Sequence, residues 1–249
     1  MKYENEQKDN MYQIALGGVS FYILFQTSFT QRQYFSGYLN SQGICNFPKF
    51  ISVSSDEINF NEKKFGSESF TEYNLLLYHI CNLLLPYNRC FFHAVAICIH
   101  NRAWLISAPS GTGKSTQYRH WKTLFGDEVR LICGDKPILE FRDSGDIIVH
   151  PSPWKGKERW PGSEPAKLAG IIYLEQGDHN EIRPMSVSEA VVPLYTQVLY
   201  QPQNETELRQ VSSMLDHMLR QVPVWKLINV GDEASVRLTY ETIYGKKGL

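Results

Sequence analysis

A glycine-rich segment in the middle of the chain constrains its fold more than any other feature. Residues 108–116 read APSGTGKST, after the apolar run of residues 103–107 and before a helical pattern over 116–125. Gly111 and Gly113 carry no Cβ, so backbone N–H groups can converge on an anion there. The positive end of the following helix dipole faces the same anion. The segment therefore predicts a strand–loop–helix unit that binds a phosphate group.

The side chains of this segment indicate a nucleoside triphosphate with Mg²⁺. The segment follows the GxxxxGK[ST] pattern, with Ala108 in the first glycine position. In that pattern Lys114 reaches the β and γ phosphates, and the hydroxyl of Ser115 binds Mg²⁺. The alternative is a glycine- and serine-rich turn that matches by chance. The residues expected to bind ATP are Ser110, Gly111, Thr112, Gly113, Lys114, Ser115 and Thr116.

An acidic residue follows a second apolar run. Residues 129–133 read VRLIC and predict a strand, after which come Gly134 and Asp135. An acid at the end of a strand beside a phosphate-binding loop can bind the same Mg²⁺ as Ser115, or remove a proton from a substrate. The alternative is a turn aspartate that starts the next connection. We expect Asp135 to be a metal ligand or a catalytic acid or base.

Around this segment, predicted strands and helices are interspersed. The connection between the apolar runs 91–99 and 103–107 is too short for a crossover, so these strands should be antiparallel neighbours. An antiparallel neighbour beside the strand that precedes a phosphate loop indicates a mixed sheet, in an α/β fold that leans toward α+β. Further strands are expected over residues 129–133, 137–141, 147–150, 169–175 and 223–228, and further helices over 186–199, 204–222 and from Asp232 onward.

The first third of the chain has a different pattern. The pair Gly17-Gly18 separates two apolar runs, which indicates a two-residue hairpin. Residues 12–60 read mostly as strands, and a helix is expected over 69–85, where Ser69 and Glu72 match a capping box. We therefore expect two domains: a small β-rich region with one helix over residues 1–88, and a larger phosphate-binding core with C-terminal helices over 89–249.

The balance of charge argues against a nucleic-acid partner. The chain has 25 Lys and Arg against 26 Asp and Glu, whereas DNA- and RNA-binding proteins neutralise phosphates with a basic face. Five cysteines without a C-x-x-C pair predict free thiols rather than a disulfide framework or a zinc site. The longest apolar runs are much shorter than the roughly 20 residues of a membrane span, and residues 1–10 lack the apolar stretch of a signal peptide. We expect a cytoplasmic protein with no membrane partner.

Three stretches resemble the HPr kinase/phosphorylase family, whose core is shared with ATP-dependent phosphoenolpyruvate carboxykinases. The first is FHAVA from Phe92, a strand with an embedded histidine beside the strand that precedes the glycine-rich segment. The second is that segment, and the third is GDKP from Gly134 with PSPWKGKE from Pro151, which resembles compact members found beside genes for ribosomally made, modified peptides. The resemblance covers roughly residues 90–180. It implies a mixed-sheet P-loop kinase core of HPr kinase type that uses ATP and Mg²⁺.

The resemblance also implies catalytic roles for three side chains. Asp135 would be the general base that takes the proton of the substrate hydroxyl, and His93 would lie near the γ phosphate or steady Asp135. The alternative for His93 is a core histidine in an apolar strand. Lys157, in a cluster of basic residues, would place a cation near the γ phosphate, and its alternative is a solvated loop residue. The family usually has two adjacent acids where this chain has Asp135 and then Lys136.

The resemblance implies an ATP-dependent kinase that transfers the γ phosphate to a Ser or Thr hydroxyl of a peptide or small protein. A ribosomally made precursor peptide is one candidate acceptor. Two alternatives stay open: a kinase for a small-molecule hydroxyl, and an ATP-gated module that binds a peptide without phosphotransfer. The lysine in place of an acid at position 136 favours the second alternative. Self-association into a homo-oligomer is also left open.

The stretch over residues 151–168 is rich in proline, glycine and lysine. This composition is typical of an active-site lid, and we expect the stretch to close over substrate. An aromatic and basic loop can stack on an acceptor peptide, so Trp154 is expected to contact the acceptor. The alternative is that Trp154 packs into the core, in which case its loss would destabilise the fold.

Overall fold

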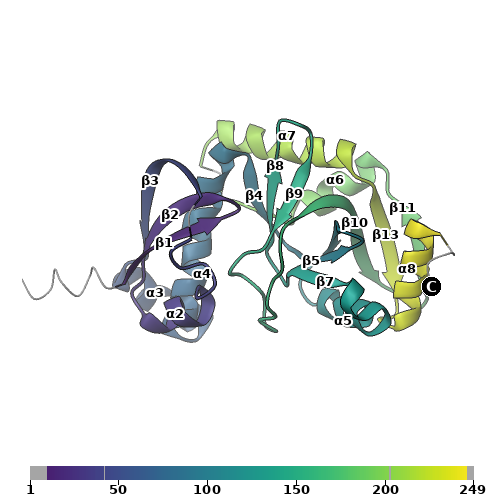
Figure 1. Cartoon of the computed structure of the whole chain (residues 1–249), viewed down its shortest axis with the longest axis horizontal. Helices are drawn as coiled ribbons and strands as arrows, with labels where there is room; N and C mark the ends of the chain where they lie inside the picture. The colour runs from purple at the N-terminus through teal and green to yellow at the C-terminus, as the bar shows by residue number, and fades with distance from the viewer. Residues whose placement is uncertain (1–9, 42, 202, 246–249) are drawn as a thin grey trace, which may run out of the picture. The chain divides into compact units, whose positions relative to one another are not determined.

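In the computed structural model, which describes residues 10–41, 43–201 and 203–245, the chain forms two compact units. The first unit is Met1–Arg89 and the second is Cys90–Leu249 (Figure 1). Each unit combines β-strands with helices. The glycine-rich segment, Asp135 and His93 all belong to the second unit, so the candidate site is built within one unit.

The first unit contains a three-stranded sheet in the order β1-β2-β3. Strands β1 and β2 are antiparallel and are joined through Gly17 and Gly18, whose φ angles are +56° and +79°, which confirms the predicted hairpin. Strand β3 pairs with β2 in parallel. The elements of this unit are β1 (Met11–Leu16), β2 (Val19–Leu24), α2 (Ser28–Tyr34), β3 (Ile44–Ser52), α3 (Ser55–Phe65), α4 (Glu68–Cys81) and the 3₁₀ helix η1 (Asn82–Tyr87).

The prediction of strands over most of residues 12–60 is wrong for α2 and α3. The α2 helix is a short segment that starts after Thr27, and Ser54 with Glu57 forms a capping box at the start of α3. The predicted capping box of Ser69 and Glu72 is also wrong, because Ser67 caps α4 instead.

The Glu72 side chain binds a distant segment. Its carboxylate is buried and accepts hydrogen bonds from the backbone N–H groups of Gln26 and Thr27, at 2.5 and 3.1 Å. Thr27 is the residue that precedes α2, so Glu72 holds the entry to that helix. A carboxylate that accepts two backbone donors replaces the water it loses on burial.

The second unit contains a mixed sheet of ten strands among the residues that the structure describes. Strands β6, β10 and β13 are parallel, whereas β5 pairs antiparallel with both β6 and β7. The mixed sheet is therefore confirmed. Its strands are β4 (Arg89–Phe92), β5 (Ala94–Ile99), β6 (Arg102–Ser107), β7 (Arg130–Cys133), β8 (Ile138–Phe141), β9 (Ile147–His150), β10 (Ala166–Gln176), β11 (Glu181–Pro184), β12 (Val198–Leu199) and β13 (Val224–Asn229).

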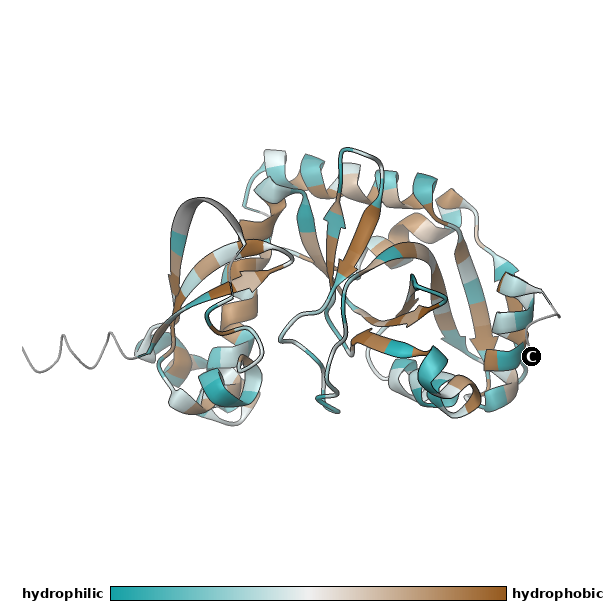
Figure 2. Ribbon diagram, in the orientation of Figure 1, coloured by the Kyte–Doolittle hydropathy of each residue, from teal (hydrophilic) through white to brown (hydrophobic). Residues whose placement is uncertain are grey.

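The helices of the second unit contact one another, and two of them contact strands of this sheet. Figure 2 shows hydrophobic and hydrophilic residues mixed along these helices. The helices are α5 (Lys114–Phe125), α6 (Val187–Tyr195), α7 (Glu205–Gln221) and α8 (Glu233–Tyr244), with the 3₁₀ helix η2 (Gly126–Glu128) after α5. Helices α5 and α8 contact each other through aromatic rings, and the Phe125 and Tyr240 rings stack at 4.5 Å between centroids. Trp121 is 2% exposed in the same cluster, so the helix after the glycine-rich segment is firmly held.

Most elements predicted in this unit are confirmed, with two corrections. The strand expected over residues 91–99 is interrupted at His93, which lies between β4 and β5. The helix expected over 186–199 ends at Tyr195, and β12 follows it. Both corrections place backbone without regular structure beside the candidate site.

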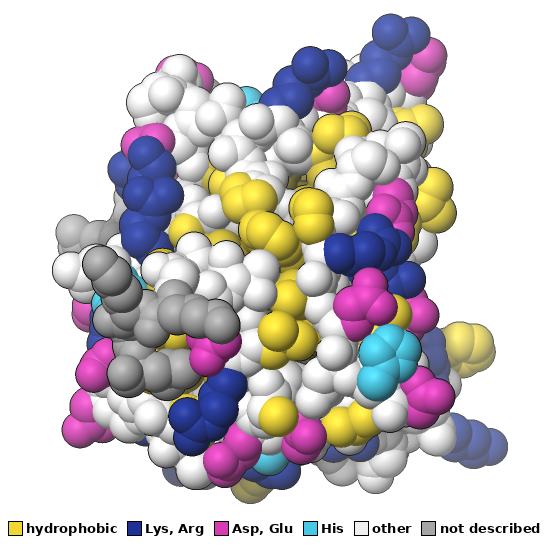
Figure 3. All heavy atoms as spheres, turned by 90° about the vertical axis from the view of Figure 1, so that its right-hand side faces the viewer, with side chains coloured by type: hydrophobic (Ala, Val, Ile, Leu, Met, Phe, Trp, Pro, Cys, Tyr) yellow, Lys and Arg dark blue, Asp and Glu magenta, His cyan; other side chains and the backbone are white. Residues whose placement is uncertain are grey.

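The face of the second unit that carries α8 and β11 shows apolar side chains surrounded by charged ones (Figure 3). The exposed apolar side chains of α6 are Val187, Val191 and Val192.

Across the described parts of the chain, no helix is long and apolar enough to cross a membrane.

Candidate functional site

The glycine loop, residues 108–113, connects the end of β6 to the start of α5. Gly111 and Gly113 have φ angles of +84° and +106°, a region that residues with a Cβ rarely adopt. A Cβ on either glycine would meet nothing within 4 Å, so the backbone angle rather than lack of space requires glycine here. The loop thus turns sharply at these two glycines, with open space where a Cβ would lie.

The start of α5 receives no hydrogen bond from a capping side chain. Gly113 is the residue before the helix and has no side chain to cap it. The first N–H groups of a helix have no partner within that helix. With the helix dipole, such N–H groups are suited to bind an anion.

A buried polar network holds the first turn of α5 in place. The Gln117 amide donates to Asn229 Oδ1 at 3.2 Å and to Ser235 Oγ at 2.7 Å. Asn229 ends β13 and Ser235 lies in the first turn of α8. The glycine loop is therefore anchored on both sides, by β6 before it and by this network after it.

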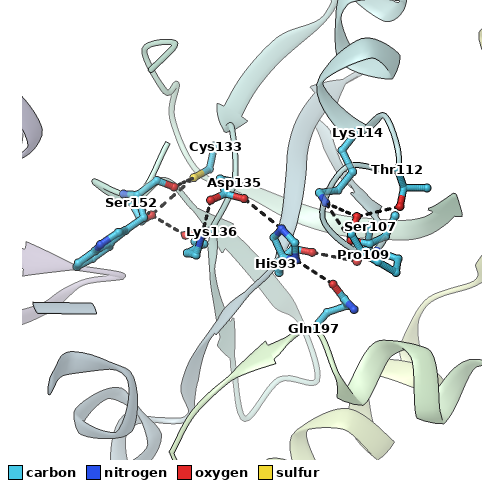
Figure 4. A network of polar contacts seen from close by, with 12 residues as sticks. His93, Ser107, Pro109, Thr112, Lys114, Cys133, Asp135, Lys136, Ser152 and Gln197 are labelled. Carbon is cyan, nitrogen blue, oxygen red and sulfur yellow. Dashed lines mark hydrogen bonds and ion pairs between the residues drawn. The ribbon is translucent and has the colours of Figure 1, made fainter. Parts of the chain in front are cut away.

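Lys114, the first residue of α5, is 8% exposed. Its Nζ donates to the backbone oxygens of Ala108 at 2.9 Å and Pro109 at 3.1 Å, at the start of the glycine loop (Figure 4). Burial lowers the pKa of Lys114, the nearby Asp135 carboxylate raises it, and the Lys136 ammonium lowers it. The Lys114 cation therefore lies over the glycine loop, within electrostatic range of Asp135.

Both oxygens of Asp135, which follows β7, are in contact with basic side chains. Oδ1 lies 3.3 Å from His93 Nε2, and Oδ2 accepts from Lys136 Nζ (Figure 4). Burial raises the pKa of Asp135, but the contacts with His93 and Lys136 outweigh burial and leave this pKa below its ordinary value. A carboxyl with a lowered pKa is ionised at neutral pH.

His93 is held by its backbone as well as by its side chain. Its N–H donates to Gln197 O at 2.8 Å, and its C=O accepts from Ser107 Oγ at 3.0 Å. Nδ1 lies 3.0 Å from Gln197 Oε1. Because the Gln197 Nε2 group donates to Thr196 Oγ1 at 2.9 Å, the amide oxygen is the atom that faces His93.

Ser107 and Gln197 are site residues that sequence reasoning missed. Ser107 is fully buried at the end of β6, and Gln197 is 4% exposed between α6 and β12. The spacing of polar residues gives no signal for Gln197, because its contact with His93 joins residues 104 positions apart.

The 151–165 loop, between β9 and β10, lies against the end of β7. Lys136 N donates to Trp154 O at 3.0 Å, and Ser163 N donates to Leu131 O at 2.8 Å. A Cβ on Gly134 would lie 2.4 Å from Lys155 O, so a side chain at position 134 would push this loop away. The anchored parts of the loop thus form a fixed wall beside Asp135.

The prediction that Trp154 contacts the acceptor is wrong. Trp154 is 1% exposed, and its ring packs edge-on against Phe91 at 5.2 Å between centroids. A ring buried in the unit cannot stack on a peptide. A Cβ on Gly162 would lie 2.5 Å from Ile132 O, so this glycine permits close packing on β7. Closure of the loop over substrate stays a prediction.

The outer part of the 151–165 loop carries the predicted catalytic lysine. Lys157 is exposed, and the structure does not bring its side chain to Asp135 or His93 through any contact among the described residues. Its neighbour Glu158 pairs with Arg119 of α5 at 2.5 Å. Trp160 packs on Tyr118 at 4.8 Å between centroids. This part of the loop therefore lies along α5.

The residues predicted to bind Mg²⁺ offer oxygen ligands, which this ion prefers. The described residues hold no cluster of three or more His, Cys, Asp or Glu side chains that could bind a metal ion. Mg²⁺ commonly takes one or two protein ligands and completes its shell with water and phosphate oxygens. The Ser115 hydroxyl and the Asp135 carboxylate are oxygen donors of the kind such a site needs, and their joint binding of Mg²⁺, which would neutralise phosphate charge, stays a prediction.

No protein-family model and no curated protein matches the chain. Among solved structures, the chain is similar to the structure of the Hpr(Ser) kinase/phosphatase from Coxiella burnetii. The two are 14% identical with a TM-score of 0.34, and the match covers 62% of this chain and 99% of that chain. A likeness of this degree carries no argument about fold or function.

Proposed function

We propose that this protein is an ATP-dependent kinase that transfers the γ phosphate to a Ser or Thr hydroxyl of a peptide or small protein. The observation that supports this function is the convergence of Lys114, Asp135 and His93 beside the glycine loop. A phosphate-binding loop alone fits any nucleotide-binding protein. An ionised carboxylate within electrostatic range of its lysine adds a base for the acceptor hydroxyl.

In this proposal Asp135 has two tasks, as the base and, with Ser115, as a residue that would bind Mg²⁺, and each other group has one. The N–H groups of the glycine loop and of the start of α5 hold the phosphates, and Lys114 turns from the loop carbonyls to the β and γ phosphates. Asp135 takes the proton of the acceptor hydroxyl while the new O–P bond forms and the bond to ADP breaks. His93 orients the Asp135 carboxylate. Lys157 would place a positive charge near the γ phosphate, a role that the family resemblance implies.

The test is phosphate transfer from labelled ATP. The purified protein, ATP and Mg²⁺ are incubated with candidate acceptors, of which the peptide encoded by a neighbouring gene is the first choice. The expected result is a mass gain of one phosphate on a Ser or Thr of the acceptor, absent with Asp135→Asn. Hydrolysis of ATP without any phosphorylated acceptor, across peptides and small hydroxyl compounds, would contradict the kinase assignment.

One contact favours a second candidate function, an ATP-gated module that binds a peptide without phosphotransfer. Lys136 occupies one oxygen of Asp135, the carboxylate that a transfer reaction needs as its base. In this alternative ATP binds and changes the affinity for a peptide. Peptide affinity measured with and without a non-hydrolysable ATP analogue, alongside the transfer assay, distinguishes the two functions.

A further inference from the structure

Lys136 is anchored more firmly than a surface lysine. Its backbone N–H donates to Trp154 O at 3.0 Å, and its C=O accepts from Ser152 Oγ at 2.5 Å. Ser152 is 1% exposed and Trp154 equally so. The backbone at position 136 is therefore fixed by buried groups of the 151–165 loop, and this fixes where its side chain begins.

The Lys136 side chain extends to Asp135 and keeps donors to spare. Its ammonium contacts Asp135 Oδ2, and the side chain is 23% exposed. An ammonium has three N–H donors and acts as a compact point charge. Only one donor is needed for the Asp135 oxygen, so the others are available to an oxygen atom that approaches from the exposed side.

Lysine charges outnumber carboxylate charges at this point. The Lys136 ammonium contacts Asp135, and the charges of both Asp135 and Lys136 act on Lys114. One carboxylate does not balance two ammonium groups. A site with such an excess of positive charge favours an anion, and an ammonium group can donate to a phosphate oxygen.

We propose that Lys136 is a further nucleotide-binding residue, whose ammonium contacts the terminal phosphate of ATP and so distinguishes a triphosphate from a diphosphate. This inference rests on the proposed function, which places the acceptor hydroxyl at Asp135. The group that this hydroxyl attacks is the terminal phosphate, so an ammonium in contact with Asp135 lies beside that phosphate. Lys114 and the glycine loop hold the phosphates that ATP and ADP share.

The test compares the affinities of ATP and ADP at a fixed Mg²⁺ concentration, measured by calorimetry. Lys136→Met keeps the length of the side chain and removes its charge, and Lys136→Arg keeps the charge. Lys167→Met is the matched control, because Lys167 is also paired with an aspartate, Asp146, at another place in the unit. Thermal unfolding of each variant shows that it is folded.

We expect Lys136→Met to weaken ATP binding by at least about tenfold, and ADP binding by less than about twofold. Lys136→Arg should keep most of the preference for ATP, and Lys167→Met should keep all of it. Equal losses for ATP and ADP, or no loss for either, would overturn the inference. If Lys136→Met does not fold, an unchanged ATP preference in the folded Lys136→Gln variant would overturn it as well. If the parental protein binds neither nucleotide, the proposed function itself is contradicted, and the inference that rests on it is overturned with it.

Discussion

The glycine loop and the 151–165 loop are both rich in proline, glycine or serine, yet they differ in where their backbone groups are used. In the 151–165 loop, Trp154 O accepts a hydrogen bond from Lys136 N, and Ser163 N donates one to Leu131 O of β7. In the glycine loop, the turn at Gly113 leads into α5 without a capping side chain. The 151–165 loop is part of the fold, and the glycine loop is suited to a ligand. Composition alone does not separate them.

Gly134, just after β7, and Gly162 of the 151–165 loop are needed for a different reason than the glycines of the glycine loop, whereas Gly156 combines a φ angle of +76° with a close contact. Gly111 and Gly113 have positive φ angles and open space around the missing Cβ. A Cβ on Gly134 or Gly162 would lie 2.4 or 2.5 Å from a backbone oxygen, of Lys155 and Ile132 respectively. Glycine thus shapes an open turn in the first region and permits close packing in the second.

The largest effect is expected at the glycine loop. Lys114→Ala removes the side chain that the proposed reaction uses on the β and γ phosphates, so turnover should fall by at least about a thousandfold. Alanine is a good helix former at the first position of α5, so the fold should be kept. Transfer of labelled phosphate measures turnover, and a melting temperature close to the parental value is the control. Parental turnover in this variant would remove the basis for treating the glycine loop as a ligand site.

Asp135 lies where the two regions meet, and its loss should have the next largest effect. Asp135→Asn keeps the shape of the side chain and removes the base, which typically costs about 10²–10⁴ in rate. ATP affinity should change much less than kcat, because the glycine loop and Lys114 are intact. Single-turnover transfer and equilibrium ATP binding separate the two quantities. A loss of ATP binding equal to the loss of rate would show that Asp135 acts on the nucleotide rather than on the acceptor.

Trp154→Ala tests the assignment of the 151–165 loop to the fold. Removing a fully buried ring should lower the free energy of unfolding by about 3–5 kcal/mol. At temperatures where the variant is folded, KM for ATP and KM for the acceptor should change by similar factors, because no substrate touches this ring. Chemical denaturation and steady-state kinetics measure these effects. A parental stability with a selectively raised acceptor KM would restore Trp154 as an acceptor contact.

Features that depend on neighbouring residues could be predicted from the sequence. The hairpin at Gly17-Gly18 and the helix after the glycine loop follow from turn chemistry and from periodicity over short windows. The strands around Asp135 follow from their apolar runs. These predictions need no knowledge of which elements lie beside one another.

Features that depend on contacts between distant residues could not be predicted. Glu72 matched a local capping pattern, but its carboxylate binds backbone groups 46 and 45 positions away. Trp154 stands in a segment of loop composition, yet Phe91 on β4 gives its ring a buried partner. Gln197 carries no motif, and its role appears only when β12 pairs with β4. In each case tertiary packing decides which of several locally plausible partners a side chain takes.

The smallest effect is expected at Lys157, in the part of the 151–165 loop that lies farthest from its anchored ends along the chain. Its exposed side chain contributes little to the fold, so Lys157→Ala should change the free energy of unfolding by less than about 0.5 kcal/mol. If Lys157 assists transfer, it acts through water, where two unit charges 4 Å apart interact by about 1 kcal/mol. Turnover should then fall by about fivefold, and more steeply at low salt than at high salt. Steady-state kinetics at two ionic strengths measure this, with Lys122→Ala on α5 as the control for loss of an exposed lysine. A parental rate at both ionic strengths would show that Lys157 takes no part in transfer, as expected if the 151–165 loop, unlike the glycine loop, serves only the fold.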